Sequence, residues 1–357
     1  MPQAFVGFDS VIPFVTCLKE YNDWNVHCLF FNRSQFEQLE CIPIYEDILK
    51  ESSSIYILKS GSWMRSYFNI INIFIRFLFA LNPRVISISG ETQKGKIRKL
   101  IKLISVIKGK YYVLPNYNAP MPMEFFENYY TKALCNNAVR KKLGKKPGKF
   151  DAYKDKRLIG ELLLQSEYDN ERADFFGHPK LRKYLGYYKL HEPWLNKIAD
   201  DKYIQNDKLR IASKCVFLIT KKAGEYFFDS YKDYIESISE SIRAVRTVYP
   251  NILIVIKPKP FRAVGVNDWI LEYIESLDDE KIVVDYTPLT FTAHKAILAI
   301  FNIASTAYFD FVVNDVPCIE HARYGKTYYQ INPNGSYMKN YGAVRTSNEE
   351  ELVEFIT

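Results

Sequence analysis

Short apolar runs alternate with longer amphipathic stretches through the C-terminal half of the chain. The apolar runs predict five strands, and the stretches between them have the 3.6-residue period of helices. Short buried strands separated by helices are typical of a parallel sheet with helices on both faces. The predicted strands are Cys215–Thr220, Ile252–Ile256, Ile282–Asp285, Ala299–Ala304 and Pro317–Glu320, and the predicted helices are Tyr231–Val248, Asp268–Ser276, Phe291–Leu298 and Ala307–Val313.

The N-terminal half alternates less regularly but predicts a second sheet of the same Rossmann-like kind. Its predicted strands are Ala4–Phe8, Val26–Phe31, Ser54–Leu58, Val85–Ser89 and Tyr111–Leu114, and its predicted helices are Ser62–Leu81 and Ile97–Ile107. The segment Tyr117–Asp207 is less sheet-like and predicts extra helices and a basic loop. We therefore expect two α/β domains, residues 1–207 and residues 208–357, which is a usual division for 357 residues.

Composition and charge narrow the class of protein. With 48% apolar and 25% charged residues the chain is a folded one, not a disordered one. The net charge is +7, yet residues 94–110 and 140–149 together hold 13 Lys and Arg and no acid. Two local basic patches of this kind face a polyanion, and we expect an anionic membrane surface or an anionic acceptor. No motif of a nucleic-acid reader accompanies them, so nucleic acid is not an expected partner.

Cysteines and the N-terminal sequence indicate a cytoplasmic protein. The six cysteines are scattered and form no CxxC pair, which is typical of reduced, buried thiols. The start MPQAFVGFDS lacks the features of a signal peptide. The apolar segment Tyr67–Leu81 is shorter than the roughly 20 residues of a membrane span and contains Arg76, so a buried or interfacial helix is expected. A peripheral position on the inner face of the membrane agrees with these features.

Two groups of polar residues follow predicted strands of the C-terminal domain. Lys257-Pro258-Lys259-Pro260 follows the strand Ile252–Ile256, and Arg262 adds a third cation. Ser305-Thr306 follows the strand Ala299–Ala304 and precedes a predicted helix, which the two hydroxyls would cap. The carboxyl ends of parallel strands meet at one edge of a sheet, where phosphorylated ligands bind. The pair of signals predicts a nucleotide pocket at this edge.

These segments resemble the C-terminal domain of GT-B glycosyltransferases that use cytidine-activated donors. The matching residues are Ile256-Lys257-Pro258-Lys259-Pro260, Ser305–Phe311 and Val316-Pro317-Cys318-Ile319, within roughly residues 210–330. The group includes bacterial capsule Kdo transferases and sialyltransferases, and the CDP-glycerol glycerophosphotransferases look similar. The resemblance implies a GT-B fold, two Rossmann-like domains facing across a cleft. It also implies a donor site that includes Glu320 and His321, which follow the strand Pro317–Ile319. Lys259 stands where these families have histidine, and a lysine can hold phosphate but cannot act as a neutral donor.

A transfer to an acceptor hydroxyl also needs a general base from the N-terminal domain. The two carboxylates at predicted strand ends are Asp9, after Ala4–Phe8, and Glu91, in the turn Ser89-Gly90-Glu91-Thr92. Glu91 is preferred, because Gly90 lets the backbone approach a ligand and the basic stretch 94–110 follows. His178 and His191 are weaker candidates.

No DxD, HExxH or Cys/His cluster is present in the sequence, so no metal and no cofactor beyond the donor are expected. The hypothesis is a metal-independent enzyme that moves a Kdo- or sialic-acid-like sugar from a CMP-linked donor to a surface polysaccharide or a lipid-linked acceptor. Two alternatives stay open. One is phosphoalcohol transfer from CDP-glycerol, and the other is a non-catalytic, two-lobed solute-binding protein.

Overall fold

The computed structural model describes residues 4–22, 24–30, 33–40, 42–57, 63–80, 84–88, 110–114, 161–164, 170, 181–220, 227–258, 269–333 and 335–357. Its contacts divide the chain into two compact units, and among the described residues unit 1 ends at Lys197 and unit 2 begins at Ile198. The sequence analysis placed residues 198–207 in the first domain, whereas these contacts place them in unit 2.

Unit 1 is built on parallel strands in two sheets. Strands β1 and β2 pair with each other, and β3, β4, β5 and β6 form a four-stranded sheet in that order. Its elements are α1 (Ala4–Asn22), β1 (His27–Phe30), α2 (Arg33–Glu40), α3 (Pro43–Ser52), β2 (Ser54–Ile57), α4 (Trp63–Phe79), β3 (Arg84–Ile88), β4 (Lys110–Leu114), β5 (Glu161–Leu164), β6 (Arg182–Tyr184), the 3₁₀ turn η2 (Tyr188–Leu190) and α8 (Glu192–Ile198), which leads into unit 2.

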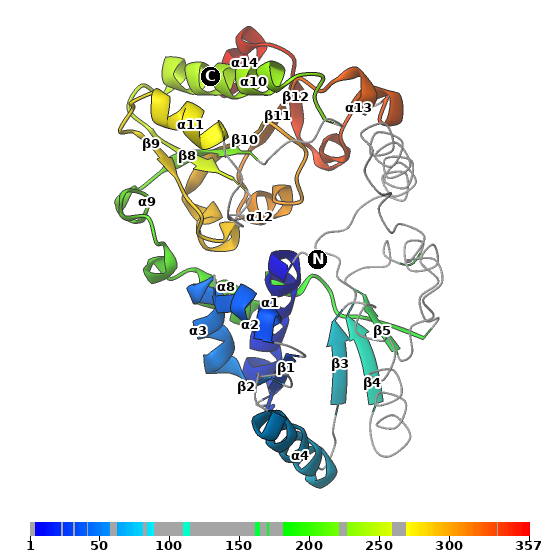
Figure 1. The fold of residues 1–357 in the computed structure, drawn as a ribbon. Coiled ribbons are helices and arrows are strands. Elements are labelled where there is room, and N and C mark those ends of the chain that lie inside the picture. The colour runs from blue at the N-terminus through cyan, green and yellow to red at the C-terminus, as the bar shows by residue number, and fades with distance from the viewer. Residues whose placement is uncertain are drawn as a thin grey trace. The chain divides into compact units, whose positions relative to one another are not determined.

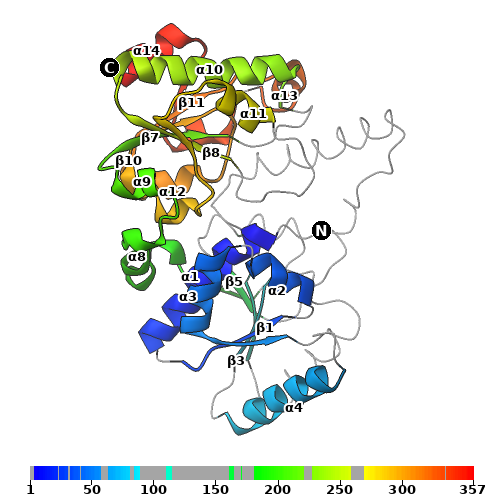
Figure 2. The ribbon, with the colours of Figure 1, turned by 60° about the vertical axis from the view of Figure 1, so that its left-hand side comes forward.

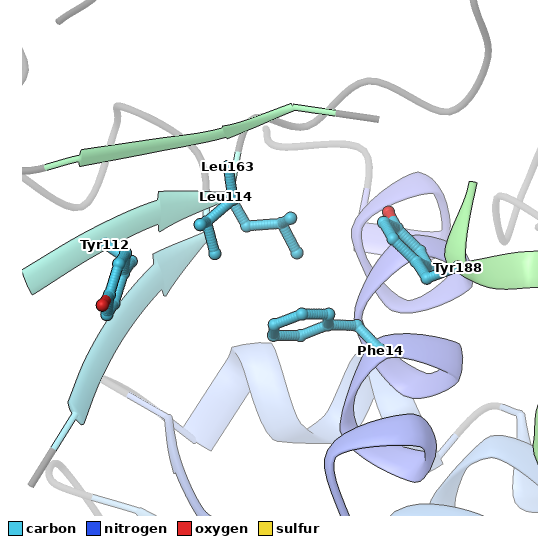
Figure 3. Packing of buried hydrophobic residues seen from close by; sticks show 5 residues of the cluster. All are labelled: Phe14, Tyr112, Leu114, Leu163 and Tyr188. Carbon is cyan, nitrogen blue, oxygen red and sulfur yellow. The ribbon is translucent and has the colours of Figure 1, made fainter. Parts of the chain in front are cut away.

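The core of unit 1 joins α1 to the four-stranded sheet. Figure 3 shows Phe14 of α1 pointing toward Leu114 of β4 and Leu163 of β5, with Tyr188 of η2 beside it. The rings of Phe14 and Tyr188 meet edge to face with their centroids 5.8 Å apart. Such aromatic contacts add to the burial of apolar area that holds the helix on the sheet.

The predicted strand Ala4–Phe8 is wrong, because these residues open the helix α1. An apolar run of five residues does not distinguish a buried strand from the start of a buried helix. The side chains from Ile12 to Cys17 are all buried, so α1 lacks the one-sided pattern that would have marked it as a helix. The strands β1 to β4 and the helix α4 form where the pattern predicted them, within a few residues, whereas β5 and β6 were not predicted.

Unit 2 is a six-stranded, wholly parallel sheet covered by helices (Figure 1). The strand order is β12-β11-β10-β7-β8-β9. Its elements are η3 (Asp201–Tyr203), α9 (Asp207–Ile211), β7 (Cys215–Ile219), α10 (Tyr231–Val248), β8 (Leu253–Lys257), α11 (Trp269–Ser276), β9 (Ile282–Val284), η4 (Leu289–Phe291), η5 (Ala293–Lys295), β10 (Ala296–Phe301), α12 (Tyr308–Val312), β11 (Cys318–His321), α13 (Lys326–Ile331), η6 (Tyr337–Tyr341), β12 (Val344–Thr346) and α14 (Glu349–Ile356).

Local sequence explains why the long helix of unit 2 forms. Ser230 caps α10, and its hydroxyl accepts a hydrogen bond from the backbone N–H of Asp233. The buried side chains Tyr234, Ile238 and Val245 recur at helical spacing and form the face that packs on the sheet. The second helix on this side, α14, packs against α10 (Figures 1 and 2).

The predicted helix Phe291–Leu298 is also wrong. Residues Leu289–Phe291 and Ala293–Lys295 form two 3₁₀ turns, and β10 already begins at Ala296. The strand therefore starts earlier than predicted and ends at Phe301. Consequently Asn302, Ile303 and Ala304 belong to the loop that leads to Ser305.

Candidate functional site

The order of strands in unit 2 creates a topological switch point. From β7 the chain moves outward through β8 and β9, and it then returns to the other side of β7 through β10, β11 and β12. The last residue of β7, Ile219, lies opposite Lys257 of β8 and Phe301 of β10. The carboxyl ends of these three strands therefore lie side by side. In open α/β sheets ligands bind outside the carboxyl ends of strands at such a point.

Ser305 and Thr306 lie in the loop that leaves β10 at the switch point. Both residues are partly exposed. The hydroxyl of Ser305 accepts a hydrogen bond from the backbone N–H of Ala307 at 3.3 Å, and the backbone carbonyl of Ser305 accepts one from Tyr308 N at 3.2 Å. Helix α12 begins one residue later than predicted, at Tyr308, and its N-cap Ala307 has no side-chain hydrogen bond, so the bond from Ala307 N–H to Ser305 is the part of the predicted capping that is observed. The loop thus presents two hydroxyl groups at the carboxyl edge of the sheet.

Lys257 is at the same edge, but its ammonium group is buried. Only 5% of its side chain is exposed, Nζ lies 2.5 Å from Oδ2 of Asp285, and it also donates to the backbone carbonyl of Thr287. Burial lowers the pKa of Lys257, and the carboxylate of Asp285 acts in the opposite direction. The sequence predicts a cation offered to phosphate at this position. Instead, Asp285 follows the neighbouring strand β9 and holds the lysine inside the protein.

Several residues of the predicted site lie outside the described residues. These are Lys259 and Arg262 of the predicted phosphate site, the preferred base Glu91, and His178. The basic stretch 140–149 also lies outside, as does the stretch 94–110 except for Lys110. Their roles stay predictions.

Glu320 helps to fix the loop at the switch point through a hydrogen bond with Tyr324. It is buried on β11, opposite Phe301 of β10, and its Oε1 accepts a hydrogen bond from the hydroxyl of Tyr324 at 2.6 Å. The same hydroxyl accepts a hydrogen bond from the backbone N–H of Ala304 at 2.7 Å. Burial raises the pKa of Glu320. Through Tyr324 the carboxyl group fixes the residue that directly precedes Ser305.

His321 belongs to a buried network beneath α10. Its Nδ1 lies 2.8 Å from the hydroxyl of Thr346 and its Nε2 lies 3.0 Å from Oε2 of Glu240. Glu240 also forms an ion pair with Arg323. Burial lowers the pKa of His321, although Glu240 opposes this effect. The ring is thus enclosed between α10 and the sheet, and it does not face a ligand as the sequence analysis expected.

Asp9 is in the helix α1, not at the end of a strand. Its Oδ1 accepts a hydrogen bond from the hydroxyl of Tyr45 at 2.6 Å, and its Oδ2 forms an ion pair with Lys189. The carboxylate thus links α1 to α3 and η2. The other candidate in this unit with a described position, His191, packs edge to face with Tyr21.

Sequence reasoning missed two residues that shape this edge, Asn302 and Tyr324. The amide Nδ2 of Asn302 lies within hydrogen-bond distance of the carbonyl of Ser237 (3.0 Å), the hydroxyl of Ser241 (2.8 Å) and the carbonyl of His321 (3.1 Å). An asparagine directly after an apolar strand is a usable signal, but its partners on α10 follow only from the sheet order. Tyr324 carried no signal in the sequence.

The described part of the site offers hydroxyl donors on a loop whose position is fixed by buried hydrogen bonds. Hydroxyl groups at the carboxyl edge of a parallel sheet are suited to phosphate and ribose oxygens. Among the residues with described positions, no group of three or more His, Cys, Asp or Glu has the arrangement of a metal site.

Comparisons with known proteins support the fold. No protein-family model matches the chain, and no curated protein matches it. Among solved structures, a Listeria monocytogenes protein assigned as a UDP-N-acetylglucosamine 2-epimerase is 12% identical, with a TM-score of 0.53, over 98% of this chain and 83% of its own. Another UDP-N-acetylglucosamine 2-epimerase is 11% identical, with a TM-score of 0.51, over 98% and 83%. The glycotransferase of kitacinnamycin is 10% identical, with a TM-score of 0.44, over 98% and 87%.

The likeness to the two epimerase structures, together with two units of parallel strands and helices, defines the class of fold. The chain has the GT-B fold with Rossmann-type α/β units, as the sequence analysis predicted. Among the residues that the structure describes, no helix has the length and apolar character needed to cross a membrane.

Proposed function

We propose that this protein is a glycosyltransferase that takes its sugar from a nucleotide-sugar donor bound by unit 2. The observation that carries the proposal is the switch point between β7 and β10, where Ser305 and Thr306 lie in the loop after β10. A nucleotide placed there would have its phosphates against these hydroxyls, beyond the carboxyl end of β7. The names of the similar structures refer to a UDP-sugar epimerase and a glycotransferase, which also favours a nucleotide-sugar substrate.

The proposed roles follow from the contacts of each residue. Ser305 and Thr306 would donate hydrogen bonds to the phosphate oxygens and so stabilise the leaving nucleotide. Lys259 and Arg262 would supply positive charge to the same group. Glu320 would act as a positioning residue, because its bond to the hydroxyl that holds Ala304 fixes the start of the loop.

The general base of the proposed reaction is Glu91. The carboxylate of Asp9 already accepts hydrogen bonds from Tyr45 and Lys189, which leaves it less suited to remove a proton from an acceptor hydroxyl. We expect Glu91→Gln to abolish sugar transfer while donor affinity changes little. A Glu91→Gln protein that transfers sugar at the rate of the natural protein would remove Glu91 from this role.

The resemblance in segments 252–260 and 305–319 favours a CMP-linked donor, Kdo- or sialic-acid-like, and a surface polysaccharide or glycolipid acceptor. The names of the similar structures instead favour a uridine nucleotide. The proposal therefore commits to the nucleotide-sugar class, with the CMP-linked sugar as the donor first tested.

Product analysis with separate donors tests the reaction. The purified protein is incubated with a CMP-linked sugar, UDP-N-acetylglucosamine or CDP-glycerol, each with and without a mixture of polysaccharide and glycolipid acceptors. Release of the free nucleotide together with a glycosylated acceptor supports the proposal. Consumption of CDP-glycerol alone favours phosphoalcohol transfer, and an isomerised sugar that stays on its nucleotide favours epimerisation. Tight binding of a small solute without any turnover would instead indicate a binding protein.

A further inference from the structure

Helix α4 presents a row of apolar side chains to the surroundings. Phe68 is 70% exposed and Phe79 is 82% exposed, although both are large aromatic residues. These two belong to one set, the α4 apolar stripe, which consists of Met64, Phe68, Ile71, Ile75 and Phe79. The spacing of three and four residues places all five on one face of the helix. Single exposed apolar residues are ordinary, but a continuous row marks an interaction surface.

The stripe faces away from the rest of unit 1. Asn69 connects the helix to β2, because its Nδ2 donates a hydrogen bond to the backbone carbonyl of Ile57 at 2.9 Å. At 3.6 residues per turn, Asn69 lies about 120° around the helix from the middle of the α4 apolar stripe. Figures 1 and 2 both show α4 at an end of unit 1, beyond the strands β1 and β2.

The charges on and near α4 are positive. The helix contains Arg65 and Arg76 and no acidic residue. Only residues 80–83 separate it from β3, and the first residues of β3 and β4, Arg84 and Lys110, lie opposite each other in the sheet. In the sequence between Glu51 and Glu124 the only acidic residue is Glu91. An apolar face bordered by cations complements a surface of anionic lipid headgroups.

The length of the helix decides how it would meet a bilayer. With 17 residues α4 is shorter than the roughly 20 residues that a membrane span requires. An amphipathic helix of this kind lies in the plane of the interface, with its apolar face among the lipid chains. A second copy of this protein is a poorer partner for the stripe, because each copy would bring the same excess of positive charge to the contact.

We propose that α4 is an interfacial helix that docks the protein on an anionic membrane surface through the α4 apolar stripe. The apolar side chains enter the bilayer interface, and the arginines and lysines near the helix meet the headgroups. This inference rests on unit 1 and does not depend on the function proposed for unit 2. In this proposal, α4 is the element that holds the protein in a peripheral position at the membrane.

Vesicle flotation with the full chain tests the proposal. The vesicles are phosphatidylcholine alone or phosphatidylcholine with about one-third phosphatidylglycerol, whose charge supplies the anionic surface. We expect the natural protein to float with the anionic vesicles and at least about tenfold more weakly with the neutral ones. The variant Phe68→Ser/Ile75→Ser/Phe79→Ser should lose at least about tenfold in partitioning, because it removes most of the inserted apolar area.

The control variant Ile211→Ser/Phe355→Ser removes exposed apolar side chains from unit 2 and should float as the natural protein does. The thermal midpoint of each variant establishes that it is folded, and the single change Phe79→Ser replaces the triple variant if that one does not fold. Absence of binding to anionic vesicles would overturn the proposal, as would equal binding to neutral vesicles or unchanged binding of the stripe variant. An oligomer that the stripe variant converts to monomer, without vesicle binding, would also overturn it and assign the stripe to self-association.

Discussion

At the scale of single residues, the contacts that a side chain makes in the fold decide its role more than the position of the residue in the sequence does. Lys257 lies at the end of the buried strand β8, where the sequence indicates a strand end. Its ammonium group, however, donates hydrogen bonds to Asp285 and to the carbonyl of Thr287. The pairing depends on which strand lies beside β8, and that information is not local. Ser305 and Thr306, by contrast, stay partly exposed where the sequence placed them.

Replacing Lys257 by Met tests whether its role is structural. The change leaves the buried carboxylate of Asp285 without its cation, which should lower the free energy of unfolding by about 3–5 kcal/mol. Urea unfolding of the variant measures this loss. The double variant Lys257→Met/Asp285→Asn serves as the control and should recover a large part of the stability. A Lys257→Met protein of normal stability that binds nucleotide weakly would instead show that Lys257 is a ligand-binding residue.

The raised pKa of Glu320 predicts a pH-dependent stability. Above the ordinary pKa of 4.5 the buried carboxyl group keeps its proton in the folded state but loses it in the unfolded state. The folded state then binds more protons, so this group makes the protein less stable as pH rises from 4.5 through its raised pKa. The variant Glu320→Gln keeps an acceptor for Tyr324 but cannot ionise. We expect the difference between the thermal midpoint of Glu320→Gln and that of the natural protein to increase, in favour of the variant, as the pH rises from about 4.5 to about 7.

The comparison across pH separates this effect from a general change in packing. A packing defect in Glu320→Gln would shift the thermal midpoint by a similar amount at every pH. A constant difference between the two proteins would therefore contradict the raised pKa.

At the scale of elements, Asn302 joins the helix α10 to the strands β10 and β11. Its amide lies close to the backbone carbonyl of Ser237 and the hydroxyl of Ser241 on one side and to the carbonyl of His321 on the other. Because these acceptors are buried, removing the amide takes one donor from each of them. The carbonyls of His321 and Ser237 still accept hydrogen bonds from the hydroxyls of Ser237 and Ser241. The residue thus ties α10 to the edge of the sheet at which the candidate site lies.

The substitution Asn302→Ala should lower the free energy of unfolding by about 1–3 kcal/mol. It should also lower the hydrogen-exchange protection of α10, since the helix loses one of its hydrogen-bonded connections to the sheet, while those of Ser237 and Glu240 to His321 remain. The surface variant Asn251→Ala is a matched control, because Asn251 is exposed and receives a hydrogen bond only at its side chain from Lys281. Equal protection of α10 in the natural protein and in Asn302→Ala would contradict the proposed connection.

Periodicity predicted the elements well where each one has a clear pattern of its own. The helix Tyr231–Val248 has a regular buried face and was predicted with its observed bounds. The strands β6 (RKY) and β12 (VRT) were missed because they contain charged residues and no apolar run, and the apolar run of β5 is only three residues long (ELLL). The helix α1 was mistaken for a strand at its start because its buried residues cover all of its faces around Ile12–Cys17.

At the scale of the whole molecule, the alternation of strands and helices was enough to predict two parallel α/β units. The GT-B fold was implied by the family resemblance of segments 256–260, 305–311 and 316–319, and the similar structures agree with it. The order of strands within unit 2 was beyond the sequence, because hydrophobic pattern identifies strands but not their neighbours. That order places the loop after β10 at the switch point. It also brings Asp285 to Lys257 and Glu240 to His321, so that both side chains are buried. Ser305, Thr306 and Lys257 therefore lie at the edge of the sheet that the sequence indicated, and their part in ligand binding stays a prediction.

The central claim is that a nucleotide binds at the switch point of unit 2 through the loop that contains Ser305 and Thr306. Titration calorimetry with CMP, CDP, UDP, GDP and TDP measures this binding and ranks the bases. For the nucleotide that binds best, the variant Ser305→Ala/Thr306→Val should bind at least about tenfold more weakly, because it removes two donors to a charged group. The control Ser276→Ala removes an exposed hydroxyl at the end of α11 and should bind as the natural protein does. Unchanged affinity in the double variant, or no binding of any of the five nucleotides, would contradict the account.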